Sequence, residues 1–216
     1  MKQIQKKTIL FDLDGTLIDS TEAILESFEV ALGQFGDVAP DEEAIKAQIG
    51  HPLDVMFRTL GVPQERVWAH VDAYKAHYRQ ISCQKTVLLP YATEAIALAK
   101  AHARLGIVTT KTALYSKEML TYMGVMEHFE VLIGREDVTH PKPHPEPVYK
   151  ALDAMGASAT SAYMIGDTPM DMEAAKAAEV LPVGVSCGYA EETTLRQYTP
   201  NVFQNAYEAV KFIVGL

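Results

Sequence analysis

Short apolar segments alternate with longer amphipathic segments along most of the chain. Five apolar segments end at polar or small residues: Ile9 to Phe11 before Asp12, 106–108 before Thr109, 131–134 before Arg135, 163–166 before Asp167, and 182–185 before Ser186. Runs this short and this apolar are typical of strands buried on both faces of a parallel sheet. Apolar residues recur at helical spacing between them, over residues 92–103, 112–123, 145–156 and 168–179. The alternation predicts an α/β fold with a doubly wound parallel sheet.

One interval is too long for this pattern. The first strand ends near Asp14 and the second begins near Leu105, about 90 residues later, whereas a crossover needs only about a dozen. Helical spacing fills the interval over residues 19–35, 41–49, 52–60 and 64–82. Asp19 and Glu22 stand at capping-box positions for the first of these helices, and Gly36 ends it.

The two ends of this interval leave the same sheet. We therefore predict an inserted α-helical cap domain over residues 18–86 that lies over the carboxyl ends of the strands. Residues 1–17 and 87–216 then form the α/β core that carries the chemistry. Ligands of doubly wound sheets gather at this edge, where the polar residues that end the apolar segments fall.

Composition and charge narrow the function classes. The 216 residues include 28 Asp and Glu against 19 Lys and Arg, a net charge of −9, which argues against binding to nucleic acid because that needs a basic stripe. No apolar stretch approaches the ~18 residues that span a bilayer, so we expect no membrane partner. Cys83 and Cys187 form no CxxC pair, which indicates reduced thiols and a cytoplasmic location. We expect a monomer or a weak homodimer.

Two acidic side chains follow the first strand in the string Phe11-Asp12-Leu13-Asp14-Gly15-Thr16. Residues two apart project to the same side of a strand, and Gly15 permits a sharp turn, so Asp12 and Asp14 can face one point. Because two close carboxylates repel, one is readily kept protonated. The pair can thus divide into a nucleophile and a general acid/base; the alternative is a solvated turn with two incidental acids.

A second acidic pair follows another strand, in Ile165-Gly166-Asp167 and Asp171. Asp167 alone could be only a helix cap. Near Asp12 and Asp14 it would be a third acid at one edge of the sheet, and such a cluster needs a divalent cation. Oxygen-only ligands suit Mg²⁺ rather than Zn²⁺.

Two further segments supply groups that bind anions. Thr109-Thr110-Lys111 ends the second core strand and offers hydroxyl and backbone N–H donors. Four alternating prolines stiffen the loop over residues 140–147 and hold Lys142 at low entropic cost. The prolines forbid a helix there, which makes a zinc site of His140 and His144 improbable; a docking motif for a protein partner is the rival interpretation of this tract.

These four pieces, in the order Asp-x-Asp, Thr, Lys and Gly-Asp-x-x-x-Asp, resemble the haloacid dehalogenase-like superfamily. The likeness is to its phosphatases of the phosphoglycolate phosphatase and β-phosphoglucomutase type, which have a helical cap after the first motif, and it covers nearly the whole chain. The departures of this sequence from the family pattern are modest. Thr110 stands where many relatives have Asn, and Glu179 stands where a Gly often ends the helix of the last motif.

The resemblance implies roles for individual residues. Asp12 would be the nucleophile and Asp14 the general acid/base, while Thr109 and Lys142 would bind and neutralise the phosphoryl oxygens. Mg²⁺ would be held by Asp12, Asp167 and the main-chain oxygen of Asp14, with Asp171 in support. The expected activity is Mg²⁺-dependent hydrolysis of a small phosphorylated metabolite, such as phosphoglycolate or a sugar phosphate, through an aspartyl-phosphate.

Within the cap, Gly50-His51-Pro52 is a candidate loop for substrate recognition, since His51 can hydrogen-bond a polar substrate; a plain helix junction is the alternative. His51 and Thr110 complete the candidate substrate-binding residues. Arg58 and Arg79 could meet a substrate carboxylate, although solvated helix faces are the commoner place for lone arginines.

Other function classes remain as alternatives. A phosphosugar mutase or an inorganic pyrophosphatase would use the same motifs, and a phospho-accepting signalling domain without turnover also places acids, a Thr and a Lys at strand ends. Gly184-Val185-Ser186-Cys187-Gly188 matches the serine hydrolase motif G-x-S-x-G, but no His or Asp follows Ser186, so that interpretation fails on chain order. The glycine-rich motifs of dinucleotide and nucleoside triphosphate sites do not occur.

Overall fold

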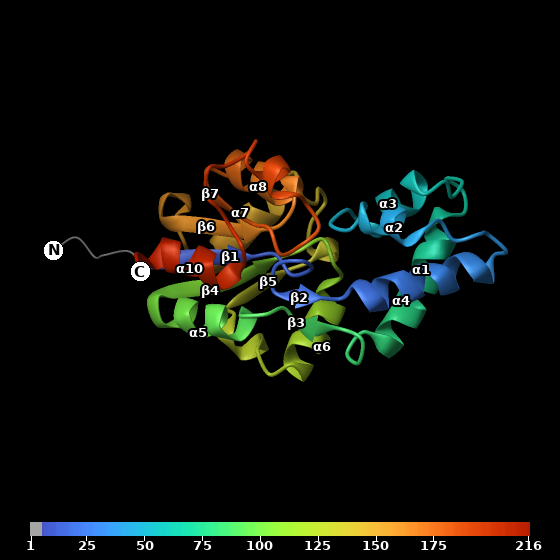
Figure 1. Ribbon diagram of the computed structural model, residues 1–216, viewed down its shortest axis with the longest axis horizontal. Coiled ribbons are helices and arrows are strands. Elements are labelled where there is room, and N and C mark those ends of the chain that lie inside the picture. The colour runs from blue at the N-terminus through green and yellow to red at the C-terminus, as the bar shows by residue number, and fades with distance from the viewer. Residues whose placement is uncertain (1–5) are drawn as a thin grey trace.

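The computed structural model describes residues 6–216 and contains a six-stranded parallel sheet in the order β5-β4-β1-β6-β7-β8 (Figure 1). Its strands are β1 (Lys7–Phe11), β4 (Ala103–Val108), β5 (Val131–Ile133), β6 (Ala162–Gly166), β7 (Leu181–Val185) and β8 (Val202–Phe203). Each strand pairs in parallel with its neighbours. The predicted doubly wound α/β fold is confirmed.

Successive strand residues point into different cores on the two faces of the sheet. In β1, Ile9 and Phe11 belong to one cluster and Leu10 to the other, as the period of two requires. The first face is covered by α5 (Ala92–His102), α6 (Ala113–Tyr122) and α10 (Ala206–Val214). The second is covered by α7 (Glu146–Met155) and α8 (Pro169–Ala177). Burial on both faces explains why the strands are apolar runs rather than alternating ones.

The strand order reverses beside β1. From β1 the chain crosses to β4 and β5 on one side and then returns to β6, β7 and β8 on the other. Ligands of open α/β sheets bind at this kind of switch point, outside the carboxyl ends of the strands. The ends of β1, β4 and β6 meet there, so Asp12, Thr109 and Asp167 come from neighbouring strands.

Residues 21–81, within the interval between β1 and β4, fold as a group of helices at one end of the molecule (Figure 1). These are α1 (Thr21–Gln34), α2 (Glu42–Lys46), α3 (Leu53–Thr59) and α4 (Val67–Ile81). Aromatic rings of Phe28, Phe57 and Tyr74 pack together between them, with centroids 4.6 to 6.3 Å apart. This packing joins three helices of the insert, and it belongs to the same apolar cluster as Ile9 and Phe11 of the sheet.

The start of α1 differs from the capping box expected of Asp19 and Glu22. Ser20 is the N-cap residue and its side chain makes no cap hydrogen bond, because its hydroxyl donates to the carboxylate of Asp14 instead. Asp19 accepts from the backbone N–H of Thr21 at 2.9 Å, and Glu22 pairs with Lys85 at 2.7 Å. The capping-box prediction is therefore wrong. The Ser20 hydroxyl, which could have capped the helix, is hydrogen-bonded to Asp14.

A two-stranded antiparallel ribbon links the insert to the core. It consists of β2 (Ile18–Asp19) and β3 (Val87–Leu88), with Ile18 opposite Leu88 and Asp19 opposite Val87. The spacing of residues along the chain did not predict it, since two-residue strands carry no periodicity. The ribbon brings the two crossings of the chain side by side at the edge where β1 ends.

The C-terminal region contains further elements that the pattern analysis left out. Besides β8 they are α9 (Glu192–Leu195) and α10. The remaining short helices are single 3₁₀ turns over Met126–His128, Arg135–Asp137 and Ala159–Ser161. The sequence carried a usable signal for α10, because Ala206, Ala209, Val210 and Ile213 are buried at helical spacing. Asn205 also caps this helix by accepting from Glu208 N at 3.1 Å.

Glu179 holds a backbone conformation that favours glycine. Its φ is +58°, and it follows α8 in a Schellman motif in which Val180 N donates to Ala175 O and Glu179 N to Lys176 O. We expect Glu179→Gly to raise the free energy of unfolding by about 0.5–1 kcal/mol, because a left-handed non-glycine residue is strained.

Denaturant unfolding measures this change. Glu173→Gly in the interior of α8 is the matched control and should lower the free energy of unfolding by about 1 kcal/mol. Equal decreases in the free energy of unfolding of both variants would show that Glu179 is not strained.

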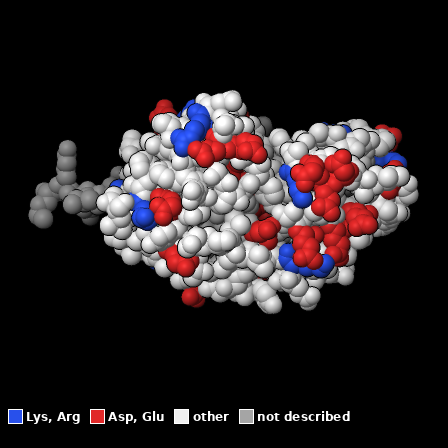
Figure 2. Space-filling model, in the orientation of Figure 1, with Lys and Arg blue, Asp and Glu red and all other residues white. Residues whose placement is uncertain are grey.

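None of the helices in the described part of the chain has both the length and the apolar character needed to cross a membrane. On the face drawn in Figure 2, acidic side chains outnumber basic ones, and the basic ones lie next to acidic groups. Ion pairs of the described residues include Arg58 with Asp54 and Lys85 with Glu26.

Candidate active site

The first motif forms a tight turn directly after β1. Asp12 N donates to Ile165 O at 2.9 Å, which ties the start of the turn to β6. The carbonyl of Leu13 then accepts from the backbone N–H groups of Thr16, Leu17 and Ile18. This turn points Asp12 into the centre of the site, where it is buried, and leaves Asp14 half-buried at the site's rim.

A buried lysine joins the first and last motifs. Lys142 Nζ lies 2.9 Å from Asp12 Oδ1 and 2.6 Å from Asp171 Oδ1, and it donates to Val108 O at 3.0 Å. Burial opposes the charge of this ammonium, but the two carboxylates outweigh burial and hold the pKa of Lys142 above its ordinary value. The structure thus brings Asp12, Lys142 and Asp171 together as a charged cluster.

Asp167 follows β6, and two neighbouring glycines leave the space that its carboxylate occupies. Its Oδ1 accepts from the Thr16 hydroxyl and its Oδ2 from Tyr189 N, both at 2.9 Å. A Cβ atom added to Gly15 or Gly188 would lie within 2.3 Å of Asp167 Oδ2, so a side chain at either position would displace the carboxylate. Gly15 is therefore needed both for its φ of +77° and for the space beside Asp167.

The donor set at the centre of the site fits a hard divalent cation. Carboxylate oxygens of Asp12, Asp167 and Asp171 lie within 4.8 Å of one another, and all three residues are buried. When they are ionised, Lys142 neutralises one of three negative charges, and two remain. Asp12 Oδ1 contacts the Lys142 ammonium at 2.9 Å and accepts no other hydrogen bond among the described residues, so the Asp12 carboxylate retains a lone pair for a cation. An all-oxygen set with two excess negative charges suits Mg²⁺.

The proton affinities of these carboxylates agree with that charge balance. Burial raises the pKa of Asp12 to about 7, and the charge of Asp171 adds to this while Lys142 opposes it. Burial, with Asp171 and Asp12 nearby, also raises the pKa of Asp167 well above its ordinary range. Both oxygens of Asp171 are occupied, Oδ1 by Lys142 and Oδ2 by the backbone and hydroxyl of Thr168. Asp171 is therefore arranged to hold Lys142.

Asp14 contacts a second lysine, which sequence analysis did not select as a functional residue. Lys111 Nζ lies 3.1 Å from Asp14 Oδ2 and donates to Tyr78 Oη of α4 at 2.9 Å. The same ammonium sits 4.5 Å from the centre of the Tyr78 ring. Asp14 Oδ1 accepts from Ser20. Asp14 is thus oriented by one residue of the core and by the first helix of the insert.

The two threonines after β4 point in different directions. Thr109 N donates to Ile133 O at 2.9 Å and its hydroxyl accepts from Lys111 N at 3.2 Å. The hydroxyl proton of Thr109 is therefore free for an anion, whereas its backbone N–H is not. Thr110 donates its hydroxyl to Gly50 O of the insert at 2.7 Å, so it joins the core to the loop that contains His51.

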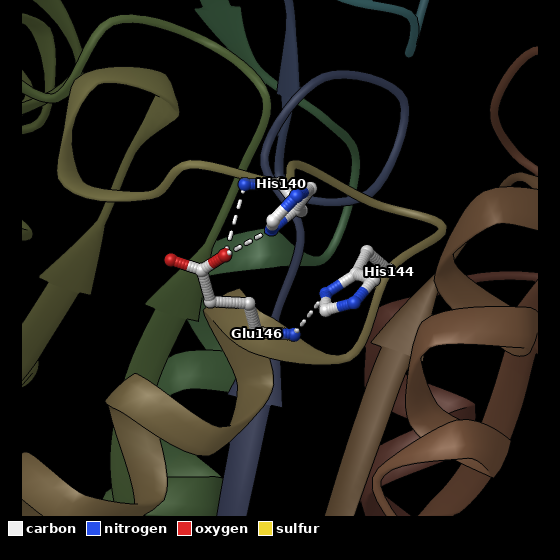
Figure 3. A group of neighbouring side chains, drawn as sticks. All are labelled: His140, His144 and Glu146. Atoms are coloured by element: carbon white, nitrogen blue, oxygen red, sulfur yellow. Dashed lines mark hydrogen bonds and ion pairs between the residues drawn. The ribbon is translucent and has the colours of Figure 1, made fainter.

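The proline-rich loop is closed by Glu146 (Figure 3). Glu146 accepts from the backbone N–H groups of Thr139 and His140 at 2.9 Å and from the His140 ring at 3.0 Å. The two backbone donors are the main reason that the pKa of Glu146 falls to about 2. His144 Nδ1 in turn accepts from Glu146 N at 3.1 Å.

His140, His144 and Glu146 lie close enough to ligate a metal ion, but the hydrogen bonds in Figure 3 already occupy the Glu146 carboxylate and Nδ1 of both rings. The cluster is explained as the closure of the loop. Its effect is to fix the chain on both sides of Lys142.

A cavity of about 250 Å³ lies between the insert and the core, beside Asp14. His51 lines it and is half-buried, and burial lowers the pKa of its imidazole. Arg58 and Arg79, the candidates for a substrate carboxylate, do not line it. Arg58 pairs with Asp54 at 2.7 Å and Arg79 with Glu118 at 2.9 Å. Lys75, Lys111 and Arg135 are the cationic side chains that do line it.

The G-x-S-x-G string forms no nucleophile site. The Ser186 hydroxyl donates to Phe203 O at 3.4 Å. Cys187 is half-buried, and burial raises the pKa of its thiol to about 11, which opposes formation of a reactive thiolate.

Besides Lys111, four contributors to the site were not predicted: Thr16, Ser20, Tyr78 and Tyr189. Thr16 and Ser20 stand within a few residues of Asp14, and their proximity was a usable sequence signal. Tyr78 and Tyr189 reach the site only through tertiary packing, since they come from α4 and from the loop after β7.

Comparisons with known proteins identify the family of this chain. The haloacid dehalogenase-like hydrolase family matches residues 9–185. The probable phosphatase IndB of Dickeya dadantii is 34% identical over 211 residues, which cover 95% of this chain and 92% of that protein. A phosphoglycolate phosphatase of Colwellia psychrerythraea is 32% identical and covers 93% of each chain.

A solved structure shares the whole fold. A haloacid dehalogenase-like family hydrolase from Streptococcus pneumoniae superimposes with a TM-score of 0.87 at 25% identity, covering 96% of this chain and 98% of that one. The matched residues include all four motifs, from Asp12 to Asp171. The chain therefore belongs to the haloacid dehalogenase-like hydrolase family.

Proposed function

We propose that the protein is a Mg²⁺-dependent phosphatase that hydrolyses a small phosphate monoester through a phosphorylated Asp12. The observation that supports this most strongly is the buried cluster of Asp12, Lys142, Asp167 and Asp171 at the switch point of the sheet. It places the Asp12 carboxylate, which accepts no other hydrogen bond among the described residues, 2.9 Å from a fixed cation. Family membership and two relatives named as phosphatases support the same reaction class.

In this proposal Asp12 attacks phosphorus in line, and the ester oxygen leaves on the opposite side. Asp14, at the rim of the site, donates a proton to that oxygen as it leaves. Water then attacks the acyl phosphate while Asp14 accepts its proton, which restores both carboxyl groups. Ser20 and Lys111 orient Asp14 for both steps.

Lys142 and the Thr109 hydroxyl bind the phosphoryl oxygens, whose negative charge must be neutralised during transfer. Asp12, Asp167 and the main-chain oxygen of Asp14 are the proposed ligands of Mg²⁺. When bound, the ion withdraws charge from the phosphoryl group and keeps the Asp12 carboxylate ionised at neutral pH.

We further propose that residues 18–86 act as a cap that encloses the leaving group. The contacts of Tyr78 with Lys111 and of Gly50 with Thr110 support this, since both join the insert to the loop that ends β4. Exclusion of water strengthens every charge interaction in the site.

Thr109→Ala should lower kcat by roughly 10²–10³, the range found for the loss of one anion-stabilising donor. The full effect is expected because the backbone N–H of Thr109 already donates to Ile133 O and cannot replace the hydroxyl. Thr109→Ser is the matched variant and should retain most of the activity. Steady-state release of phosphate measures both; a normal rate in Thr109→Ala would remove Thr109 from the site.

The proposed function is tested with a panel of phosphorylated compounds: phosphoglycolate, sugar phosphates, nucleotides and pyrophosphate, each with Mg²⁺ or with chelator. We expect phosphate release from at least one monoester, and only with Mg²⁺. Full activity in chelator would contradict the metal assignment. A stable acyl phosphate without turnover would instead identify a phospho-accepting domain, and isomerised product without free phosphate would identify a mutase.

A further inference from the structure

The cavity beside Asp14 has two chemically different walls. Its insert side is mainly apolar, formed by residues that include Ile49, Met56, Val71 and Tyr74. Its core side carries Lys111 and other polar groups. Under the proposed function Asp14 protonates the leaving oxygen, so a cavity that opens beside Asp14 is the place for the alcohol part of the ester.

Helix α4 forms a continuous wall from Asp14 to the outer end of this cavity. Trp68, Val71, Tyr74 and Tyr78 recur at helical spacing and all line it. At 1.5 Å per residue, the ten residues from Tyr78 to Trp68 span about 15 Å. Tyr78 is the inner end because its hydroxyl bonds the lysine that pairs with Asp14. A leaving group that fills this length must be much larger than a two-carbon acid.

Trp68 marks the outer end of the wall. It is the only tryptophan of the chain, and 57% of its surface is exposed although it lines the cavity. An indole that is half in water and half in a cavity offers a flat apolar face at low entropic cost, a surface that favours stacking with another ring.

The apolar wall of the insert offers few favourable contacts to a short anionic alcohol. Burial of a carboxylate against apolar side chains is unfavourable unless a cation pairs with it. Lys111 already pairs with Asp14, and Arg135 donates to Val138 O. Lys75 of α4 has no ion pair or hydrogen bond among the described residues, and the hydrogen bond of Arg135 goes to a neutral carbonyl, so Lys75 and Arg135 are the cations on which recognition of a short acid would depend.

We propose that the cavity selects phosphate monoesters whose alcohol carries an aromatic ring, which packs along α4 and stacks on Trp68. This inference rests on the proposed phosphatase function and narrows its substrate class. It does not favour phosphoglycolate or inorganic pyrophosphate, since neither has apolar surface to place against Val71 and Tyr74.

Primary alkyl phosphates test the proposal because their leaving alcohols have similar reactivity and differ mainly in the surface they bury. We would compare kcat/KM for ethyl, phenylethyl and naphthylethyl phosphate with that for phosphoglycolate. Phenylethyl phosphate should exceed ethyl phosphate by roughly 10²-fold, as expected for burial of a ring in an apolar pocket. The gain should arise mostly in KM.

Three variants test which side chains contribute to the selection of aromatic esters. Trp68→Ala should lower kcat/KM about tenfold for the aromatic esters and less than about twofold for ethyl phosphate. Tyr122→Ala, which removes an exposed aromatic ring outside the cavity, should leave every ratio unchanged. Lys75→Met should leave the preference for aromatic over ethyl esters intact.

The outcomes distinguish this inference from the proposed function. If ethyl phosphate and phosphoglycolate are hydrolysed as well as phenylethyl phosphate, the inference fails and the phosphatase stands. Dependence of phosphoglycolate hydrolysis on Lys75, together with no effect of Trp68→Ala, would also overturn it and assign the cavity to short acids. If the wild-type protein hydrolyses none of these esters but releases phosphate from a sugar phosphate, the inference fails and the phosphatase stands. If it hydrolyses none of these esters and no compound of the earlier panel, the proposed function itself fails, and the inference with it.

Discussion

Asp12→Asn is expected to lower kcat by roughly 10⁴-fold or more, a loss typical of removing a nucleophile. An amide cannot form the acyl phosphate, whereas Lys142 keeps its partner Asp171 at 2.6 Å, so the rest of the site stays in place. The fold should also persist. Burial raises the pKa of Asp12 to about 7, which means that the buried position disfavours the charge that the substitution removes.

The measurements are steady-state phosphate release and thermal unfolding of the same samples. Asp153→Asn, an exposed change on α7, is the matched control and should alter neither. The reaction of a substrate with a chiral phosphoryl group adds an independent check, because two in-line displacements return the original configuration. Inversion at phosphorus would mean that water attacks directly and that Asp12 is not phosphorylated.

Chelation of divalent ions is expected to remove nearly all activity and to make stability depend on pH in a defined direction. The pKa of Asp12 lies near 7 in the folded protein and at 3.8 ordinarily. Between these pH values the folded state binds more protons than the unfolded state. The stability that this proton provides is present in full below pH 3.8 and is lost as pH rises through about 7.

Metal-free protein should therefore lose Tm from pH 5 to pH 8 as the buried carboxylates ionise. Mg²⁺ should restore more Tm at pH 8 than at pH 6, since its binding requires those carboxylates to be deprotonated. Asp167→Asn is the variant that should abolish this Mg²⁺ effect, and Asp153→Asn should retain it. A Tm that responds equally to Mg²⁺ at both pH values would contradict the assignment of the cation to this cluster.

The contrast between Asp171 and Asp12 shows where sequence reasoning reached its limit. Both are acids that follow strands, and spacing alone cannot separate a metal ligand from a carboxylate that holds a lysine. The difference arises because Thr168 and Lys142 occupy both oxygens of Asp171, while the Asp12 carboxylate has the Lys142 contact at Oδ1 and no other hydrogen bond among the described residues. The contact between Lys142 and Asp171 joins residues that are 29 apart in the chain. The contacts of Thr168 with Asp171 depend on the rotamer of the aspartate side chain.

The prediction of how α1 is capped was wrong for a related reason. Local spacing predicted that Asp19 and Glu22 would close the helix, but the hydroxyl at the N-cap position belongs to Ser20 and bonds Asp14. Helix signals are local in the chain, so they assume that a side chain near a helix end serves the helix. At an active site a stronger charged acceptor competes for it.

The sequence by itself predicted the doubly wound class of the fold, five of the six strands of the main sheet with the helices between them, and the edge of the sheet where the motif residues lie. These follow from the period of apolar residues and from motifs whose members are neighbours in the chain. Only the tertiary structure decided which oxygens are free, that Lys111 pairs with Asp14, and that α4 presents Trp68 and Tyr78 to one cavity. Those features depend on residues brought together from distant segments by packing, and no local period encodes which side chains will meet.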